Sequence, residues 1–381
     1  MKVSLTDICD FQGGTQPPKD EWIDQPAQGY VRMLQIRDFT QSDKNYIEYV
    51  KDTGKLKTCI EDDILIGRYG ASIGKILTGL AGAYNVAIVK TIPDEKVVSK
   101  KYLYWYLNSQ YFQRFISNVG SRAAQAGFNK NDLGAAQIPL VDKERQEEIC
   151  EVLEKANELI SLRKQQLAKL DELIKARFVE MFGTFPANPF RWDTGKIQDV
   201  VSDVRYGSSR PAVEDGKYPY LRMNNITYSG ELDLRDTKRI DIPDSELDKC
   251  TVRRGDVLFN RTNSKELVGK TCVYNRDELM VLAGFVIRVR VNERIRSDVL
   301  SAFLNMDFSK RMLIGMCKTA IGQANINAKE LQNIDLYIPP IELQDQFVAL
   351  KNKIDQQKQT VQQSLEKLEL LKKALMQEYF G

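Results

Sequence analysis

The sequence predicts an α+β protein made of two similar α/β globular domains in tandem, each followed by a long α-helix. Three observations predict this class: an internal repeat, short β-branched runs between glycines, and two long segments without proline or glycine. The 381 residues are enough for two or three domains that each bury a core. With 28% charged and 43% hydrophobic residues, global disorder is excluded.

The repeat is clearest at the helix ends, where residues 177–183 recur as residues 375–381, a spacing of 198 residues from Gly183 to Gly381. The same spacing relates further identical pairs, which are Gln125/Gln323, Asn129/Asn327, Leu133/Leu331, Gln146/Gln344 and Leu170/Leu368. Nearer the start the spacing drifts, as loop insertions would cause. The matched stretches there are 14–16 with 207–209, 30–33 with 220–223, and 63–68 with 256–261. Their common order indicates duplication.

The first globular domain is expected at residues 1–143, and the linker with the second domain at 184–341. Apolar β-branched runs predict strands at 63–66, 86–89, 255–259 and 285–289. Helical spacing follows at 100–119 and 297–316. We expect the apolar residues at this spacing to lie in the core rather than in a binding site, namely Leu103, Tyr106, Leu107, Phe112, Ile116, Leu300, Leu304, Phe308 and Met312.

Spacer helices are expected at 144–183 and 342–381, where apolar residues recur at a near-heptad spacing. Gly183 and the prolines of the linker 183–192 end the first helix. Since the second domain starts close to that end, the two helices are predicted to form an antiparallel coiled coil that holds the domains apart. About 36 residues at ~1.5 Å each make a rod of roughly 54 Å. The alternative is two separate amphipathic helices, each on its own domain.

Composition excludes several kinds of chemistry. The sequence has no histidine, which removes the usual serine and cysteine triads and imidazole metal sites. Its six cysteines are widely spaced, as expected for reduced thiols in the cytoplasm. We expect no membrane segment and no metal. The stretch 264–271 ends like a phosphate-binding loop but has serine in place of the first glycine, so nucleotide binding is disfavoured.

Two similar readers on a stiff two-fold spacer suit double-stranded DNA, whose helical repeat is about 34 Å. Because the halves differ in sequence, two different half-sites are expected. The predicted contact residues of the first half are Thr15, Gln16, Lys19, Arg37, Arg68, Tyr69, Lys75, Ser121, Arg122, Gln125, Asn129 and Lys130. Those of the second half are Tyr206, Ser208, Ser209, Arg210, Asn224, Arg261, Asn263, Lys265, Lys270, Thr319, Gln323, Asn325 and Asn327.

Residue chemistry supports this set, since arginine suits guanine edges, amides suit adenine, and Ser, Thr or Lys suit phosphates. For each residue alone, a solvated loop is an equally good interpretation. Gln125, Gln323, Asn129 and Asn327 have a further alternative, because recurrence in divergent domains favours helix capping or loop bracing over base choice.

The whole chain resembles the specificity subunit of type I restriction–modification systems. The resemblance rests on the two variable domains, the helix starts 144–149 and 342–347, the helix end 181–183 and the linker 188–192. It implies two target recognition domains that read a bipartite, asymmetric site, and helices that dock two modification subunits. One departure is that family members often carry a further piece of the conserved region, whereas both ends are short here.

The resemblance also implies that this chain is not an enzyme by itself and needs no cofactor. Modification subunits would bring S-adenosylmethionine and methylate adenine, and restriction subunits would use ATP and magnesium. Two other hypotheses stay open. One is a coiled-coil scaffold that binds proteins at both ends, and the other is an enzyme that uses the loop Gly269-Lys270-Thr271.

Overall fold

The computed structural model describes residues 1–41, 46–122, 127–320 and 323–381. These residues form two compact units. Unit 1 comprises residues 1–164 and 363–381, and unit 2 comprises residues 165–362. Both units combine helices with several small sheets, so the predicted α+β class with two domains is confirmed.

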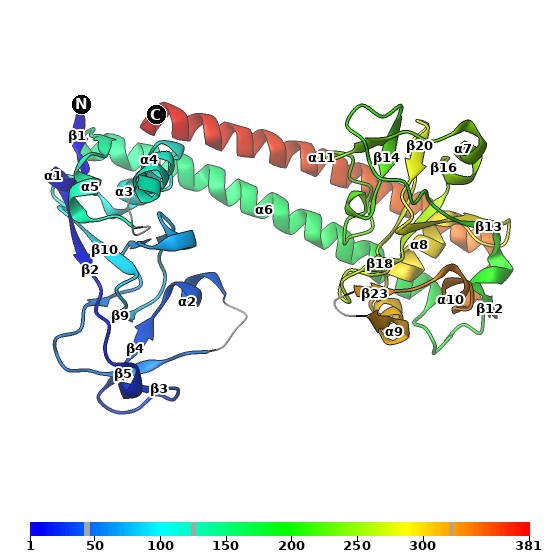
Figure 1. Ribbon diagram of the computed structural model, residues 1–381, viewed down its shortest axis with the longest axis horizontal. Coiled ribbons are helices and arrows are strands. Elements are labelled where there is room, and N and C mark those ends of the chain that lie inside the picture. Colours follow the sequence, from blue (N-terminus) through cyan, green and yellow to red (C-terminus); the bar gives the residue numbers. More distant parts are fainter. Residues whose placement is uncertain (42–45, 123–126, 321–322) are drawn as a thin grey trace. The chain divides into compact units, whose positions relative to one another are not determined.

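Unit 1 contains eleven strands within the described residues (Figure 1). They are β1 (Lys2–Ser4), β2 (Cys9–Gly13), β3 (Trp22–Ile23), β4 (Tyr30–Leu34), β5 (Tyr49–Lys51), β6 (Thr58–Cys59), β7 (Leu65–Gly67), β8 (Ile76–Leu77), β9 (Gly82–Tyr84), β10 (Ile88–Pro93) and β11 (Gln137–Pro139). Its short helices are α1 (Leu5–Ile8), α2 (Ile36–Thr40), α3 (Lys100–Leu107), α4 (Gln110–Arg122) and α5 (Lys130–Gly134).

The strands of unit 2 are β12 (Asp193–Lys196), β13 (Val201–Tyr206), β14 (Tyr218–Leu221), β15 (Lys238–Ile240), β16 (Thr251–Val252), β17 (Val257–Asn260), β18 (Thr262–Asn263), β19 (Thr271–Val273), β20 (Met280–Leu282), β21 (Val286–Val291), β22 (Lys318–Ala320), β23 (Gln323–Asn325) and β24 (Asp335–Ile338). Its short helices are α7 (Asp244–Cys250), α8 (Ser297–Asn305), α9 (Asp307–Met316) and α10 (Ala328–Gln332).

The sheets of the two units share one topology. An antiparallel sheet of order β2-β10-β7-β8 in unit 1 corresponds to β13-β21-β17-β19 in unit 2. A second sheet is built around a parallel pair, β4 with β9 in unit 1 and β14 with β20 in unit 2. The pairs β1–β11 and β12–β24 also correspond. The repeat in the sequence is therefore a repeat of the fold.

The predicted helical stretches 100–119 and 297–316 are each divided into two helices. Asn108 and Ser109 separate α3 from α4, and the Ser109 hydroxyl accepts a hydrogen bond from the Phe112 amide (3.2 Å). Met306 separates α8 from α9 with an extended backbone (φ −67°, ψ 148°). Period alone does not reveal such breaks, because the apolar side chains on both sides still point into the same core.

The predicted core residues of these helices are largely confirmed. Leu103, Tyr106, Leu107, Phe112, Ile116, Leu300 and Leu304 are all no more than 1% exposed. Phe308 and Met312 are half-buried and pack against the unit-2 core.

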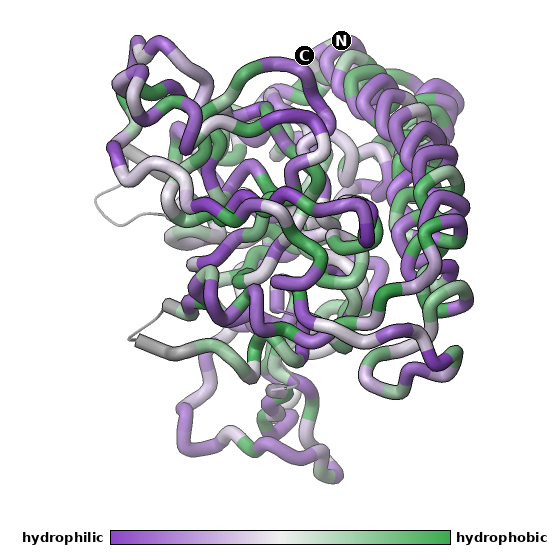
Figure 2. The backbone as a smooth tube through the Cα atoms, turned by 90° about the vertical axis from the view of Figure 1, so that its right-hand side faces the viewer, coloured by the Kyte–Doolittle hydropathy of each residue, from purple (hydrophilic) through white to green (hydrophobic). Residues whose placement is uncertain are grey.

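The long helices are α6 (Lys143–Phe182) and α11 (Ile341–Phe380), of 40 residues each. Each unit contains one part of both, and the two parts run antiparallel. In unit 1, Lys164 pairs with Glu369 (3.0 Å), and Asn157 accepts from Lys372 (2.7 Å). The earlier residue of α6 thus contacts the later residue of α11. Figure 2 shows hydrophilic and hydrophobic residues alternating along these helices, as an amphipathic pair requires.

In unit 2 the same antiparallel order joins Phe178 to Phe347, whose ring centroids are 5.6 Å apart, and Asp171 to Lys358. The helix ends close the cores of both units, since Phe182 and Phe380 are fully buried. This explains why the motif 181–183 recurs as 379–381. The alternative of two separate amphipathic helices is therefore wrong.

The recurrent glutamines at the helix starts are structural. Gln146 is fully buried, accepts from the Ser99 amide (2.9 Å) and donates to the Val97 and Val141 carbonyls (both 2.9 Å). Gln344 makes the matching bonds in unit 2, to Arg296, Arg294 and Pro339. Each amide satisfies backbone groups that would otherwise be buried without partners.

Candidate nucleic-acid interface

Four chain segments meet at one end of the four-stranded sheet in unit 1. The segment after β2 is held to the β9–β10 turn by bonds from the Gly14 amide to the Ile88 carbonyl (3.1 Å) and from the Thr15 amide to the Tyr84 carbonyl (3.0 Å). The segment after β7 joins the same turn, because the Arg68 amide donates to the Ala87 carbonyl (2.8 Å). The fourth segment leads into α5 and bridges to Tyr69 through Gly127.

Unit 2 repeats this assembly. Gly207 donates to Val286 (3.3 Å) and Ser208 to Leu282 (2.6 Å), as Gly14 and Thr15 do in unit 1. The Arg261 amide donates to the Phe285 carbonyl (3.0 Å). The segment leading into α10 is β23, which pairs with β18. We name these two assemblies the unit-1 cluster and the unit-2 cluster.

The recurrent glycine of the predicted loops is required by close packing. A Cβ atom on Gly14 would lie 2.1 Å from the carbonyl oxygen of Asn85, and one on Gly207 would lie 2.1 Å from that of Leu282. No side chain fits at either position. The loops at 13–19 and 206–211 are thus rigidly seated where they cross the turn.

Arg68 and Tyr69 lie together at the unit-1 cluster. The Arg68 Nε atom donates to the Phe128 carbonyl (2.8 Å), and the guanidinium lies 5.0 Å from the centroid of the Tyr69 ring. Tyr69 is 40% exposed. Arginine stacked on an exposed ring is suited to contact a base or a phosphate.

Arg261 occupies the matching position in unit 2, but its ring partner comes from another strand. Its guanidinium lies 4.8 Å from the centroid of the Tyr206 ring at the end of β13. Its terminal nitrogens donate to the Gly284 carbonyl (3.4 Å) and to the Asn325 Oδ1 atom (3.1 Å). Tyr206 in turn accepts from the Ala328 amide (2.8 Å), so these residues form one connected group.

Asn129 and Asn327 cap the helices that follow them. Asn129 accepts from the Asn131 and Asp132 amides (2.8 and 3.1 Å), and its own amide donates to the Asp132 carboxylate (2.7 Å). Asn327 forms the same reciprocal box with Glu330 (2.9 Å each way). The capping alternative is confirmed for both residues.

Lys19, just before β3, and Arg37, in α2, lie around a buried carboxylate beside the second sheet of unit 1. Glu48 is 6% exposed and accepts from Arg37 and from Gln35, and Lys19 lies 3.8 Å from it. Arg37 also stacks on Tyr46, which is 56% exposed. Glu48 is not recognisable from the sequence, because a single glutamate in a polar stretch forms no pattern.

Two predicted cations have acidic partners. Lys130 pairs with Asp10, and hydrogen bonding to Lys130 lowers the pKa of that carboxyl. Arg210 makes a bidentate contact with Glu246 (2.7 and 3.2 Å), and this contact lowers the pKa of Glu246. Both pairs lie on the surface and can open to meet a phosphate at small cost.

Lys270 lies inside unit 2 rather than on a loop surface. It is 8% exposed, its Nζ atom donates to the Met223 carbonyl (3.1 Å), and burial lowers its pKa. Its ammonium group is thus turned away from the position that a phosphate-binding loop requires.

The remaining predicted residues differ in exposure. The side chains of Gln16, Lys75, Ser209, Asn224 and Lys265 are exposed, Thr15 and Asn263 are half-buried, and Ser208 is buried. Gln125 lies outside the described residues, as do the side chains of Ser121, Arg122, Thr319 and Gln323.

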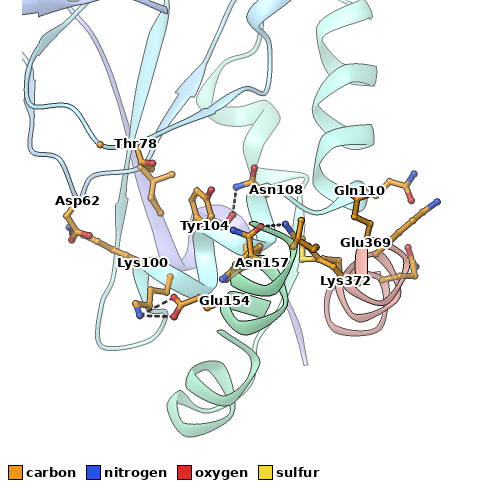
Figure 3. Close-up of a pocket in the computed structure, with 18 of the residues that line it drawn as sticks. Asp62, Thr78, Lys100, Tyr104, Asn108, Gln110, Glu154, Asn157, Glu369 and Lys372 are labelled. Carbon is orange, nitrogen blue, oxygen red and sulfur yellow. Dashed lines mark hydrogen bonds and ion pairs between the residues drawn. The ribbon is translucent and has the colours of Figure 1, made fainter. Parts of the chain in front are cut away.

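A groove in unit 1 lies between α3 and the paired ends of α6 and α11 (Figure 3). Its charged side chains pair with one another, as Lys101 does with Glu154 (3.1 Å). Lys372 donates to Asn157 and lies 5.1 Å from the centroid of the Trp105 ring. These contacts fasten the helices to the domain.

Over the described ranges, no helix is long and apolar enough to cross a membrane. Within the same ranges, no group of three His, Cys, Asp or Glu residues could hold a metal ion.

The sequence of this chain matches the family model of the type I restriction modification DNA specificity domain over residues 1–172 and 189–370. The chain is 26% identical over 196 residues to a putative type I restriction enzyme MjaX specificity subunit of Methanocaldococcus jannaschii, covering 50% of this chain and 46% of that one. It is 20% identical to the EcoKI specificity subunit of Escherichia coli K12, covering 69% and 60%. The chain thus spans about half of the first relative and three fifths of the second.

A further relative, the MjaVIII specificity subunit of M. jannaschii, is 24% identical over 400 residues, covering 98% of this chain and 90% of its own. Two solved structures share the fold. One, from work on complex assembly and conformational transition of the type I R-M system, has a TM-score of 0.60 at 17% identity and covers 100% of this chain and 97% of its own. The other, the S subunit of M. genitalium, has a TM-score of 0.55 at 15% identity, covering 100% and 96%.

Proposed function

Because the chain belongs to the type I restriction modification DNA specificity family, we propose that it is the DNA-recognition subunit of a type I restriction–modification complex. It would read a bipartite, asymmetric site in double-stranded DNA, one half-site with each domain. In this proposal residues 1–143 and 184–341 are the target recognition domains, and 144–183 and 342–381 are the spacer helices.

The observation that carries this proposal is the duplicated cluster. Two domains present an arginine, an exposed aromatic ring and a tightly seated glycine loop on the same four segments. Rigid elements position these groups, as sequence recognition requires. The surrounding side chains differ, which suits two different half-sites.

We further propose that the paired helices set the gap between the two half-sites in the DNA. Charged and aromatic contacts fix the antiparallel register within each unit, from Lys164–Glu369 in unit 1 to Phe178–Phe347 in unit 2. Two modification subunits would dock on these helices and supply S-adenosylmethionine. Restriction subunits would supply ATP and magnesium chemistry. The chain itself would be non-catalytic, and the assembly would act in the cytoplasm.

A two-headed scaffold that binds only proteins is the rival function. It gives no reason for two equivalent arginines stacked on exposed tyrosines in the clusters. The enzyme hypothesis is not favoured either, because Lys270 of its loop faces the protein interior.

Methylome sequencing of the host with and without the gene tests the proposal. We expect a bipartite adenine-methylation motif with a fixed gap that disappears on deletion, and an unchanged methylome would contradict the function. Arg68→Ala and Arg261→Ala, made in the assembled methylase, should each weaken binding to that site. Because contacts to phosphates weaken as salt is added, the affinity of the wild-type methylase for DNA should fall steeply with salt concentration. Lys96→Ala serves as the control, because Lys96 is exposed and lies beyond the end of β10 that faces away from the unit-1 cluster.

A further inference from the structure

The two equivalent arginines hold their guanidinium groups in different ways. Arg68 and Arg261 follow corresponding strands, and both amides donate to the corresponding turn, at Ala87 and at Phe285. The backbones therefore place both side chains at the same site. What each side chain does next differs.

Arg68 keeps its terminal nitrogens available. Its Nε atom is bound to the Phe128 carbonyl, and neither terminal nitrogen makes a hydrogen bond to any described residue. A guanidinium anchored through Nε presents its two remaining nitrogens in a fixed direction. That arrangement matches the O6 and N7 acceptors of guanine in the major groove.

Arg261 uses its terminal nitrogens inside the protein. One donates to the Gly284 carbonyl and the other to Asn325, while its buried Nε atom has no partner among the described residues. The guanidinium thus ties the β20–β21 turn to the segment before α10. Arg261 is a positioning residue for that turn rather than a free fork.

The turn that Arg261 braces carries an exposed aromatic ring. Phe285 is 54% exposed. Its carbonyl accepts from the Arg261 amide (3.0 Å), and the turn on either side is fixed by bonds from Val286 to Ala283 (2.9 Å) and from Gly284 to Ser208 (2.7 Å). In unit 1 the same position is Ala87, which is half-buried. Unit 2 therefore presents a large apolar group where unit 1 presents a methyl group.

We infer that the two domains recognise bases by different chemistry at this shared position: Arg68 contacts a guanine edge, and Phe285, braced by Arg261, contacts the methyl group of a thymine. The inference rests on the proposed function. The thymine methyl is the one apolar group that bases display in the major groove, so it is the natural partner of an exposed ring there.

Base analogues test the two contacts separately in the assembled methylase, on the site given by the methylome. Each thymine of the second half-site is replaced in turn by deoxyuridine, which lacks the methyl group. Each guanine of the first half-site is replaced by 7-deazaguanine, which lacks N7. Affinities are measured for wild type, Arg68→Ala, Arg261→Ala and Phe285→Ala, and circular dichroism checks folding.

One deoxyuridine should weaken wild-type binding about fivefold and leave Phe285→Ala unaffected. One 7-deazaguanine should weaken wild type about tenfold and leave Arg68→Ala unaffected. Arg261→Ala should weaken binding, but it should lose as much affinity as wild type does when a guanine is replaced by 7-deazaguanine. Leu279→Ala, which removes another exposed apolar side chain (47% exposed) from the other end of β20, should keep full sensitivity to deoxyuridine.

The thymine contact would be overturned if Phe285→Ala lost the same affinity, relative to wild type, on sites with thymine and with deoxyuridine at every position. That result would indicate that Phe285 wedges between base pairs instead. A guanine coupling for Arg261 equal to that of Arg68 would overturn the difference between the domains. Wild-type protein without specific binding would overturn the proposed function itself, and the inference with it.

Discussion

In both units a helix holds the glycine turn before the edge strand of the antiparallel four-stranded sheet, which is β8 in unit 1 and β19 in unit 2. The side chain that holds it differs. In unit 1, Gln113 of α4 donates to the Gly74 carbonyl (2.9 Å). In unit 2, Lys310 of α9 donates to the Gly269 carbonyl (2.5 Å). Both glycines have positive φ angles, +75° and +79°. The duplicated backbone preserves the bond while the donor changes from a neutral amide to an ammonium group.

This difference shows which features the two units hold in common and which they do not. Close backbone contacts are kept, because a glycine that touches another chain segment tolerates no side chain. Donors that only need to reach a carbonyl can be exchanged. The same rule applies to the two clusters. Their glycine loops are kept in both units, whereas the side chains around them differ and could read different bases.

The largest expected effect comes from breaking a shared backbone contact. In Gly14→Ala and Gly207→Ala the new Cβ atom would lie 2.1 Å from a backbone carbonyl oxygen. Each substitution should therefore lower the free energy of unfolding by about 3 kcal/mol or more. Urea unfolding of the full chain measures the loss, and peptide-level hydrogen–deuterium exchange should place it in unit 1 for the first variant and unit 2 for the second.

Gly29→Ala is the matched control, because nothing lies within 4 Å of its added Cβ atom, although its φ is +79°. It should cost only about 1 kcal/mol. A cost at Gly14 or Gly207 no greater than this would show that the close approach is not what fixes the loops.

A second prediction uses pH to separate the units. Desolvation of the ammonium group, aided by the charges of Lys175 and Lys270, lowers the pKa of Lys310 from 10.5 to about 7. Between these values the folded protein binds fewer protons than the unfolded chain, so the free energy of unfolding should rise with pH from about 7 upwards. One proton gives at most about 1.4 kcal/mol per pH unit.

Lys310→Gln installs the side chain found in unit 1 and should remove this rise while keeping the bond to Gly269. Exchange protection of α9, measured between pH 7 and 9 and corrected for the intrinsic exchange rate, provides the test, with α4 as the internal reference. A rise that survives in Lys310→Gln would assign it to another group.

The smallest expected effect concerns the shared helix caps. Asn129→Ala and Asn327→Ala should each lower the free energy of unfolding by about 1 kcal/mol, since each removes a capping box. Asn→Ser at either position keeps a capping oxygen and should retain most of the stability. If the serine variants are stable and still bind DNA as wild type, capping explains the recurrence. A specific loss of DNA affinity with stability intact would instead give these asparagines a contact role.

Part of the candidate site was accessible from sequence. Arg68 and Arg261 were found because each directly follows a recognisable strand, and Gly14 and Gly207 because their loops recur. Phe285 was missed, because a phenylalanine at the start of a strand is ordinarily core. Glu48 was missed because its importance comes from two cations that approach it only in the folded domain.

The duplication, the mixed α and β character and the two long helices follow directly from the order of residues along the chain. Periodicity and spacing along the chain are local properties, and each position reports on its neighbours. Tertiary structure alone decided which rings stack on the two arginines, that Lys270 turns inward and that Phe285 stays outside. These outcomes depend on segments far apart in the chain, whose meeting is set by sheet pairing and packing rather than by any local preference.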